Sequence, residues 1–243
     1  MSASQGEKII RLHDLFKTYS TLELALASDR PIAIDGIHSR LLGVFGARGG
    51  YGVFDKGQKS PGLLRRNLLW YRPDEVPTLE RIMFPMLQQA PPSWSWMAYM
   101  GKIDFLRLEF DKIEWKEVHS PWSTDQTAAQ PYGHAIALRR GSDMALQGRI
   151  RDIDMEGGSD VEMAGKLQFD IPSEGGGDKV RKLQCVVLGV KKGTEALEER
   201  RHYFILVRPT GSSRSSGHDF ERVGAGYLPG LYLSATRQDA WIY

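Results

Sequence analysis

Apolar residues recur every three or four positions at the start of the chain, with charged residues between them. The apolar positions are Ile9, Leu12, Phe16 and Tyr19. This spacing is that of one face of a helix, so it predicts an amphipathic helix at the start of the chain. The next segment, 21–27, is rich in helix formers and predicts a short second helix.

A longer helix is predicted over residues 31–45. Ser28 and Asp29 can cap the amides that follow them, and Pro31 suits a first helical turn. The apolar stripe expected on this helix is Ile34, Ile37, Leu41 and Val44. We expect the stripe to face the β-rich part of the molecule. A glycine-rich segment, 43–52, ends the helix; a further helix is expected at 62–70 and a turn of helix at 78–84.

From residue 93 onward the pattern changes to short strand-like runs separated by turn-rich patches. The runs are 94–99, 105–115, 134–139, 144–153, 166–171, 183–190, 202–207 and 220–223. Many short strands with such turns are typical of an antiparallel sandwich or barrel. We therefore predict an α+β fold for residues 1–243 as a single domain. In it, a helical N-terminal third (1–90) packs on a β-rich remainder (91–243).

Composition narrows the class of protein. The chain is 41% hydrophobic and 26% charged, as is usual for a soluble globular protein. Its net charge of +2 is spread over interspersed residues, so no nucleic-acid partner is expected.

Cys185 is the only cysteine, which excludes an intramolecular disulfide. With no leader pattern and no apolar run of membrane-spanning length, we expect a cytoplasmic protein without a membrane partner. The oligomeric state stays open.

The most distinctive motif is Pro-Pro-Ser-Trp-Ser-Trp-Met-Ala-Tyr, residues 91–99. Trp94 and Trp96 are two positions apart, so on a strand they would project from one face. With Tyr99 they predict an aromatic platform. Such a platform is either a core anchor or the wall of a ligand pocket, and core packing is the commoner role of large aromatics.

The motif resembles a Pro-Ser-Trp-Ser-Trp-Ala-like segment in the C-terminal region of fungal heterokaryon incompatibility (HET) proteins. Other segments that resemble this family, in the same order, are 19–26, 28–34, 36–37, 68–70, 185–189, 203–207 and 221–226. The N-terminal HET domain proper is absent from these 243 residues, so its signalling roles do not transfer. The resemblance implies a C-terminal module that works by binding, as a recognition or regulatory element in a fungal cytoplasm, with a protein partner.

The alternative function is an enzyme without a cofactor, such as a cyclase or isomerase, that acts on a small apolar molecule in an aromatic-lined pocket. Asp35 and His38 are three apart on the predicted helix, so Asp35 could set the tautomer of an edge histidine for proton transfer. For this alternative, the catalytic candidates are Asp35, His38, Asp104 and His134. The binding candidates are Trp94, Trp96, Tyr99 and Arg40.

Neither a metal nor a nucleotide cofactor is expected. The six histidines lack the paired spacing of metal ligands. The glycine segments 46–52 and 224–230 lack the pattern of a phosphate-binding loop, and both are better interpreted as turns.

Overall fold

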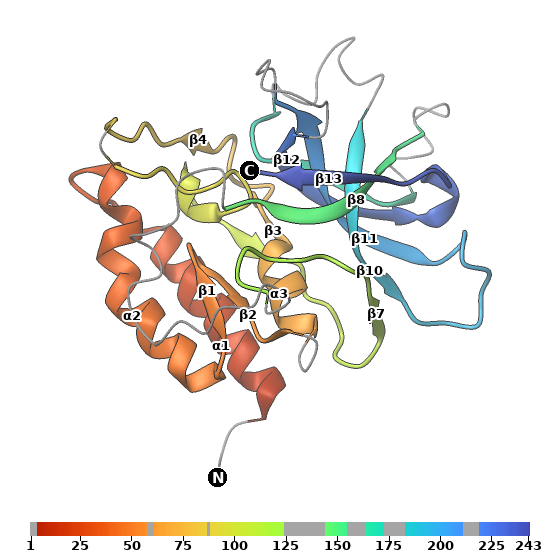
Figure 1. Cartoon of the computed structure of the whole chain (residues 1–243), viewed down its shortest axis with the longest axis horizontal. Helices are drawn as coiled ribbons and strands as arrows, with labels where there is room; N and C mark the ends of the chain where they lie inside the picture. Colours follow the sequence, from red (N-terminus) through yellow and green to blue (C-terminus); the bar gives the residue numbers. More distant parts are fainter. Residues whose placement is uncertain are drawn as a thin grey trace.

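The computed structural model describes residues 4–57, 61–86, 88–123, 144–154, 164–172, 183–210 and 219–243. Figure 1 shows two layers, with the helices of the N-terminal part on one side and a large sheet from the C-terminal part on the other. The predicted α+β class is confirmed. The strand predicted at 134–139, and His134 with it, lie outside the described residues.

Three α-helices form the helical layer of the described chain. They are α1 (Gln5–Ser20), α2 (Arg30–Phe45) and α3 (Pro61–Leu68). Helix α1 begins with a capping box, in which Ser4 and Glu7 bond to each other's backbone amides. Its buried residues include Ile9, Leu12 and Phe16, as the spacing predicted.

The prediction of a short helix at 21–27 is wrong. The hydroxyls of Ser20 and Thr21 donate to the carbonyls of Lys17 and Thr18, and these bonds close the end of α1. Only a 3-10 turn at Ala27–Asp29 follows before α2. Local side-chain bonding therefore outweighs helix propensity in this segment.

Helix α2 exists where predicted, but its orientation differs from the predicted stripe. Ile34 is buried, whereas Ile37 and Val44 are 45% and 60% exposed. The buried face instead carries His38 and Phe45. Their neighbour is Phe54 of the β1–β2 hairpin, and the Phe45 and Phe54 rings lie 5.6 Å apart. An aromatic ring removes more apolar area from water than a valine, so burying Phe45 sets the rotation of the helix.

The strands of the N-terminal half are short. They are β1 (Arg48–Gly50), β2 (Val53–Asp55), β3 (Trp70–Tyr71), β4 (Glu80–Arg81), β5 (Tyr99–Met100), β6 (Asp104–Phe105) and β7 (Ile113–Trp115). They pair as hairpin-like couples, β1 with β2, β3 with β6 and β4 with β5, while β7 joins the large sheet. The helical turn predicted at 78–84 is thus wrong, since Glu80–Arg81 pairs with Tyr99–Met100.

The strand predicted at 105–115 is divided, because arginine side chains of α3 hold the intervening segment. The guanidinium of Arg66 donates to the carbonyls of Leu108 and Glu109 and lies 4.1 Å from the centre of the Phe110 ring. Arg65 donates in the same way to the carbonyls of Lys116 and Val118. These bonds supply the partners that a strand ladder would otherwise provide.

The large sheet closes on itself. Its long strands are β8 (Leu146–Asp152), β9 (Lys166–Phe169), β10 (Gln184–Lys191), β11 (Arg201–Pro209), β12 (Asp219–Pro229) and β13 (Gln238–Ile242). They follow the order β11-β10-β8-β13-β12-β9, and an additional β11–β12 pairing completes a ring. Among these strands, β12 and β13 pair in parallel, and the other pairs among the described residues are antiparallel. Of the two architectures predicted, an antiparallel sandwich or barrel, the closed sheet is a barrel, and the parallel β12–β13 pair departs from the predicted antiparallel pattern.

Strands β10 and β11 are buried on both faces. Along β10, Val186 and Leu188 belong to the core cluster shared with the helices, and Cys185 and Val187 belong to a second cluster. Neighbouring side chains of a strand point to opposite faces, so each strand contributes to both cores. The helical layer and one face of the sheet therefore share a continuous core.

Candidate functional site

The aromatic motif does not form a strand at its tryptophans. Trp94 lies in a turn and Trp96 begins a 3-10 turn at Trp96–Ala98, so the predicted strand over 94–99 is wrong. The cause is Ser95, whose hydroxyl accepts from the Met97 amide and donates to the Tyr51 carbonyl. A short hydroxyl side chain of this kind competes with ladder bonding and favours a turn.

The aromatic side chains of the motif are packed in the core. Trp94 and Trp96 have no exposed surface, and Tyr99 is 3% exposed. The Trp94 ring meets Trp122 edge-on, with centroids 6.0 Å apart, and its Nε1 donates to the Met144 carbonyl. Further ring contacts of the motif join Phe16 to Trp96 at 5.2 Å, Tyr19 to Trp96 at 6.0 Å and Trp70 to Tyr99 at 5.6 Å. These contacts make the platform a core anchor.

His38 lies in the core instead of at the edge expected for an acid–base group. It is 2% exposed, and its ring lies 4.7 Å from that of Phe54. Burial lowers the pKa of His38 to about 4, against a smaller opposing effect of its hydrogen bond to the Val53 backbone. Asp35 is half-buried and Arg40 is exposed on other sides of α2. Truncating His38 would therefore remove core volume.

Asp104 belongs to a different neighbourhood from His38. Its carboxylate pairs with Lys17 Nζ of α1 at 2.5 Å. Nearby, the His13 ring stacks on Phe105 at 4.0 Å, and its Nε2 lies 3.0 Å from Asn67 Oδ1. Burial lowers the pKa of His13 to about 4, although the bond to Asn67 opposes the shift. Of the sequence-predicted residues, Trp94, Trp96 and Tyr99 all lie in the core, where each ring contacts aromatic residues outside the motif.

The residue that joins the distant segments is Arg222 of β12, which the sequence prediction did not single out. It is fully buried and forms a two-point ion pair with Asp170, with both N–O distances at 3.1 Å. Its guanidinium also donates to the carbonyls of Leu68 and Trp70, and lies 3.3 Å from the centre of the Trp70 ring. Burial raises the pKa of Asp170, and the Arg222 charge opposes that shift.

Ser93 links the same cluster to the aromatic motif. The backbone amide of Arg222 donates to Ser93 Oγ at 2.9 Å, and the Ser93 hydroxyl donates to the Tyr243 carbonyl. Trp70 Nε1 donates to the Trp94 carbonyl at 2.9 Å. Segments 68–70, 93–94 and 221–222, which lie far apart in the sequence, thus meet at one place. A signal was present in the sequence, because Phe220 and Arg222 are two positions apart and on a strand share one face, which places a cation beside an apolar residue.

Beside this cluster the surface has an open pocket of about 230 Å³. We call it the proline pocket, and its lining residues are Arg81, Gln89, Ala90, Pro91, Pro92, Ser93, Met144, Thr210, Glu221 and Tyr243. The Glu221 carboxylate receives Arg81 at 2.8 Å and Arg208 at 2.7 Å. Burial raises the pKa of Glu221, but the two arginines lower it by more, so the net shift is downward and the carboxylate is ionised at neutral pH.

Several other groups carry no visible chemistry. Cys185 is fully buried, and burial raises the pKa of its thiol. Within the described ranges, no three His, Cys, Asp or Glu side chains gather where they could hold a metal ion.

No helix in the described part of the chain is long and apolar enough to cross a membrane.

Comparison with known proteins found no similar family, curated protein or solved structure.

Proposed function

We propose that this chain is a binding module of the HET type, a recognition or regulatory element in the cytoplasm of a filamentous fungus, and that the proline pocket receives its protein partner. The main support for the proposal is the position of the aromatic motif, residues 91–99. Pro91, Pro92 and Ser93 line the pocket, while the tryptophans that follow them anchor the core. Glu221, from another segment of the resemblance, lies in the same wall.

The pocket has the size of a docking point for a side chain. Its volume of about 230 Å³ is below the range of roughly 300–1,000 Å³ that is usual for drug-sized ligands. Prolines, a methionine and a tyrosine supply apolar lining, and the Arg81–Glu221 pair supplies charge. Protein interfaces likewise combine apolar and polar groups.

The enzyme alternative needs an open cavity walled by aromatics. Trp94, Trp96 and Tyr99 instead contact other aromatic side chains, and His38 is buried against Phe54. These observations favour binding over catalysis.

A binding screen against purified N-terminal HET domains tests the proposal. The chain is immobilised, and each domain is titrated to roughly 100 μM, a concentration that detects the weak end of specific association. We expect at least one domain to bind. Pro92→Asp and Arg81→Glu in the pocket should weaken that binding at least tenfold. The matched control is Arg149→Glu, a 57% exposed arginine of β8 outside the pocket lining, which should leave it unchanged.

Two results would reject the proposal. One is no binding by any domain, and the other is binding that the pocket variants leave unchanged while a variant elsewhere on the surface removes it. Thermal melts of each variant must match the parent protein, because Pro92 lies next to the buried Ser93.

A further inference from the structure

The outward face of β13 carries a large aromatic side chain, Trp241, which is 41% exposed. Its neighbours along the strand, Ala240 and Ile242, are buried in the core cluster shared with the helices. Neighbouring side chains of a strand point to opposite faces, so Trp241 points away from that core. A single exposed apolar residue is normal, and what lies beside Trp241 therefore decides its role.

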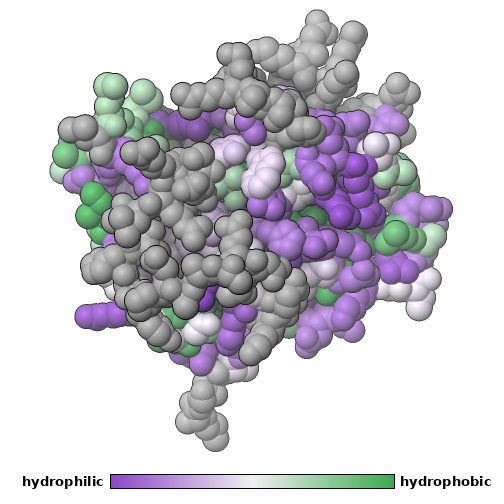
Figure 2. All heavy atoms as spheres, viewed as in Figure 1, coloured by the Kyte–Doolittle hydropathy of each residue, from purple (hydrophilic) through white to green (hydrophobic). Residues whose placement is uncertain are grey.

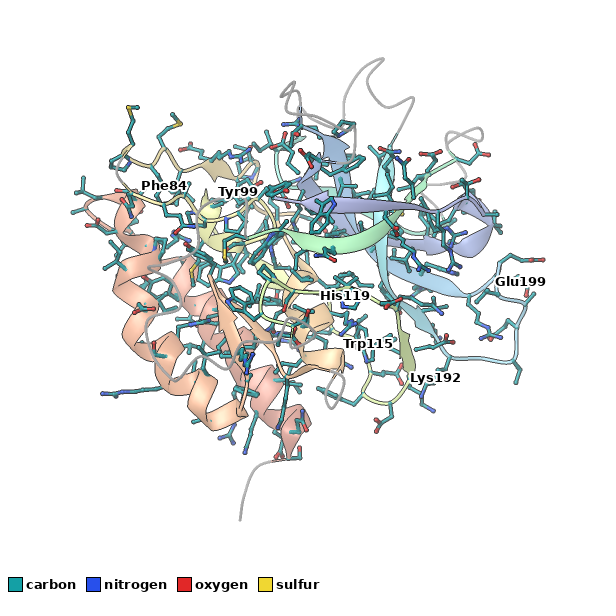
Figure 3. All side chains as sticks on the ribbon, in the orientation of Figure 1. Phe84, Tyr99, Trp115, His119, Lys192 and Glu199 are labelled. Atoms are coloured by element: carbon teal, nitrogen blue, oxygen red, sulfur yellow. The ribbon has the colours of Figure 1, made fainter. Side chains whose placement is uncertain are left out.

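Polar side chains lie in register on both sides of Trp241. The strand pairings place Gln147 of β8 opposite Trp241 on one side and Asp219 of β12 on the other. Gln147 is paired in turn with His119, which Figure 3 labels. Directly paired residues share one face of a sheet, and neighbouring strands lie about 4.8 Å apart. The four side chains thus form a row about 14 Å across.

The two polar groups beside the indole ring are not used by the fold. Within the part of the chain that the structure describes, neither the Gln147 amide nor the Asp219 carboxylate has a hydrogen bond or an ion pair. Both side chains are half-buried, so the strands hold them close to the sheet. An amide offers both donors and acceptors, and a carboxylate offers acceptors. Hydrogen-bonding capacity of both kinds is therefore available next to the ring.

The charges around Trp241 cancel. We counted the charged residues within two positions of Trp241, Gln147 and Asp219 on the described strands, together with the arginines that bond to Glu221. The carboxylates are Asp219, Glu221 and Asp239, and the arginines are Arg149, Arg81 and Arg208. Figure 2 shows mostly hydrophilic residues over β8 and β13. Such a face is polar but close to neutral, unlike the positive groove that binds single-stranded nucleic acid.

We propose that Trp241, Gln147 and Asp219 form a binding subsite for one pyranose ring of a neutral saccharide. A pyranose has a face of C–H bonds and a rim of hydroxyl groups. The C–H bonds carry partial positive charge and suit the negative face of the indole ring. The hydroxyls both donate and accept, which matches the amide on one side of the ring and the carboxylate on the other.

The subsite is distinct from the proline pocket, because none of its three residues lines that pocket. It is open to water and offers one ring and two polar side chains. We therefore expect weak binding, with a dissociation constant of about 1–10 mM for a disaccharide.

Nuclear magnetic resonance of the ¹⁵N-labelled full chain tests the proposal. The chain has six tryptophans, and loss of one indole N–H signal in Trp241→Phe identifies that of Trp241. Cellobiose, maltose and diacetylchitobiose are titrated separately to roughly 50 mM, above the expected dissociation constant. At least one should shift the Trp241 signal to saturation. Mannitol, which has hydroxyls but no ring face, should leave the signal unchanged.

Variants assign the binding to the three side chains, with saturation-transfer difference spectra as the readout. Trp241→Ala should abolish the signal of the bound sugar, and Trp241→Tyr should retain part of it. Gln147→Ala and Asp219→Ala should each weaken binding at least threefold. The matched control for Asp219→Ala is Asp14→Ala, an exposed carboxylate of α1, which should bind like the parent. Circular dichroism must show every variant folded.

The proposal is overturned if none of the three disaccharides shifts the Trp241 signal, if mannitol shifts it equally, or if Trp241→Ala still binds. Arginine amide is titrated as a further probe. A shift with arginine amide and none with the sugars would assign the ring to a cation instead and would also overturn the proposal. Partner binding at the proline pocket is measured separately with HET domains, so the two proposals can fail independently.

Discussion

At the scale of single residues, Arg222 is the side chain on which the junction of the two layers depends. It satisfies one buried carboxylate and two backbone carbonyls at once. Removing one member of a buried ion pair leaves an uncompensated charge, which typically costs about 3–5 kcal/mol. We therefore expect Arg222→Leu to lower the free energy of unfolding by about 3–5 kcal/mol, as measured by urea denaturation.

Two variants separate the buried charge from simple loss of volume. Arg222→Leu combined with Asp170→Leu should be more stable than Arg222→Leu alone, because no buried carboxylate remains unpaired. Arg208→Leu removes a 44% exposed arginine from Glu221 and should cost no more than about 1 kcal/mol. If Arg208→Leu and Arg222→Leu lowered the free energy of unfolding equally, burial of the ion pair would not determine the loss of stability.

His38 predicts a dependence of stability on pH. Its pKa is about 4 in the folded chain and about 6.5 when unfolded, so the unfolded chain takes up the proton first as the pH falls. The contribution is complete above pH ~6.5 and is lost toward pH ~4. One such histidine should cost about 2 kcal/mol between pH ~7 and pH ~5. His13 acts in the same direction.

Urea denaturation at the two pH values checks this effect. His38→Gln cannot take up the proton, so its loss of stability over the interval should be smaller than that of the parent by about 2 kcal/mol. His119→Gln is the matched control, because that histidine is partly exposed. If His38→Gln lost as much stability between the two pH values as the parent, the His38 ring would have to be already charged or accessible in the folded chain.

At the scale of elements, helix α1 could be predicted from the sequence and the orientation of α2 could not. Along α1 the apolar residues occupy one face, so spacing alone identifies the buried side. Along α2 apolar residues occur around the helix, and contact with Phe54, 9 positions after Phe45, decides which side is buried. The turn at Trp94 was missed because it depends on the bond from Ser95 to Tyr51, a residue distant in sequence.

The glycines of α2 and of the β1–β2 turn should respond in opposite ways to alanine. Gly36→Ala and Gly43→Ala should each stabilise the folded chain by about 0.5–1 kcal/mol, since nothing blocks the new methyl group. Gly52→Ala should destabilise the fold by more than that. Gly52 has φ +77°, and its Cβ would lie 2.3 Å from Trp96 Nε1. Thermal melts of the three variants and the parent protein measure these effects.

At the scale of the whole molecule, the two layers share one core cluster, which runs from Ile9 of α1 to Ile242 of β13. Arg222 and Ser93 add polar links across the same junction. We expect a single cooperative unfolding transition, in which tryptophan fluorescence and far-ultraviolet circular dichroism coincide. Two separated transitions would show instead that the helical layer and the sheet unfold as independent units.

The class of the fold followed from the change in periodicity near residue 93, but the closure of the sheet did not. Strand β13 was not predicted, and it forms the ring by pairing with β8 on one side and β12 on the other. Such partners are separated by many residues, so no local pattern records them. The same holds for the proline pocket, whose lining combines Arg81, the 89–93 segment and Glu221.

Because Cys185 is buried, its reaction with a thiol reagent can be used to measure how often the folded chain opens. The thiol lies near the start of β10 with no exposed surface, and no second cysteine competes for a reagent. A disulfide reagent added to the native protein can therefore react only when the sheet around β10 separates. The thiolate is the reactive form, and it sets the intrinsic labelling rate of an exposed thiol. When opening and closing are fast, the observed labelling rate is this intrinsic rate multiplied by the fraction of molecules that are open. Measured under native conditions, that rate reports how seldom the sheet opens around the start of β10.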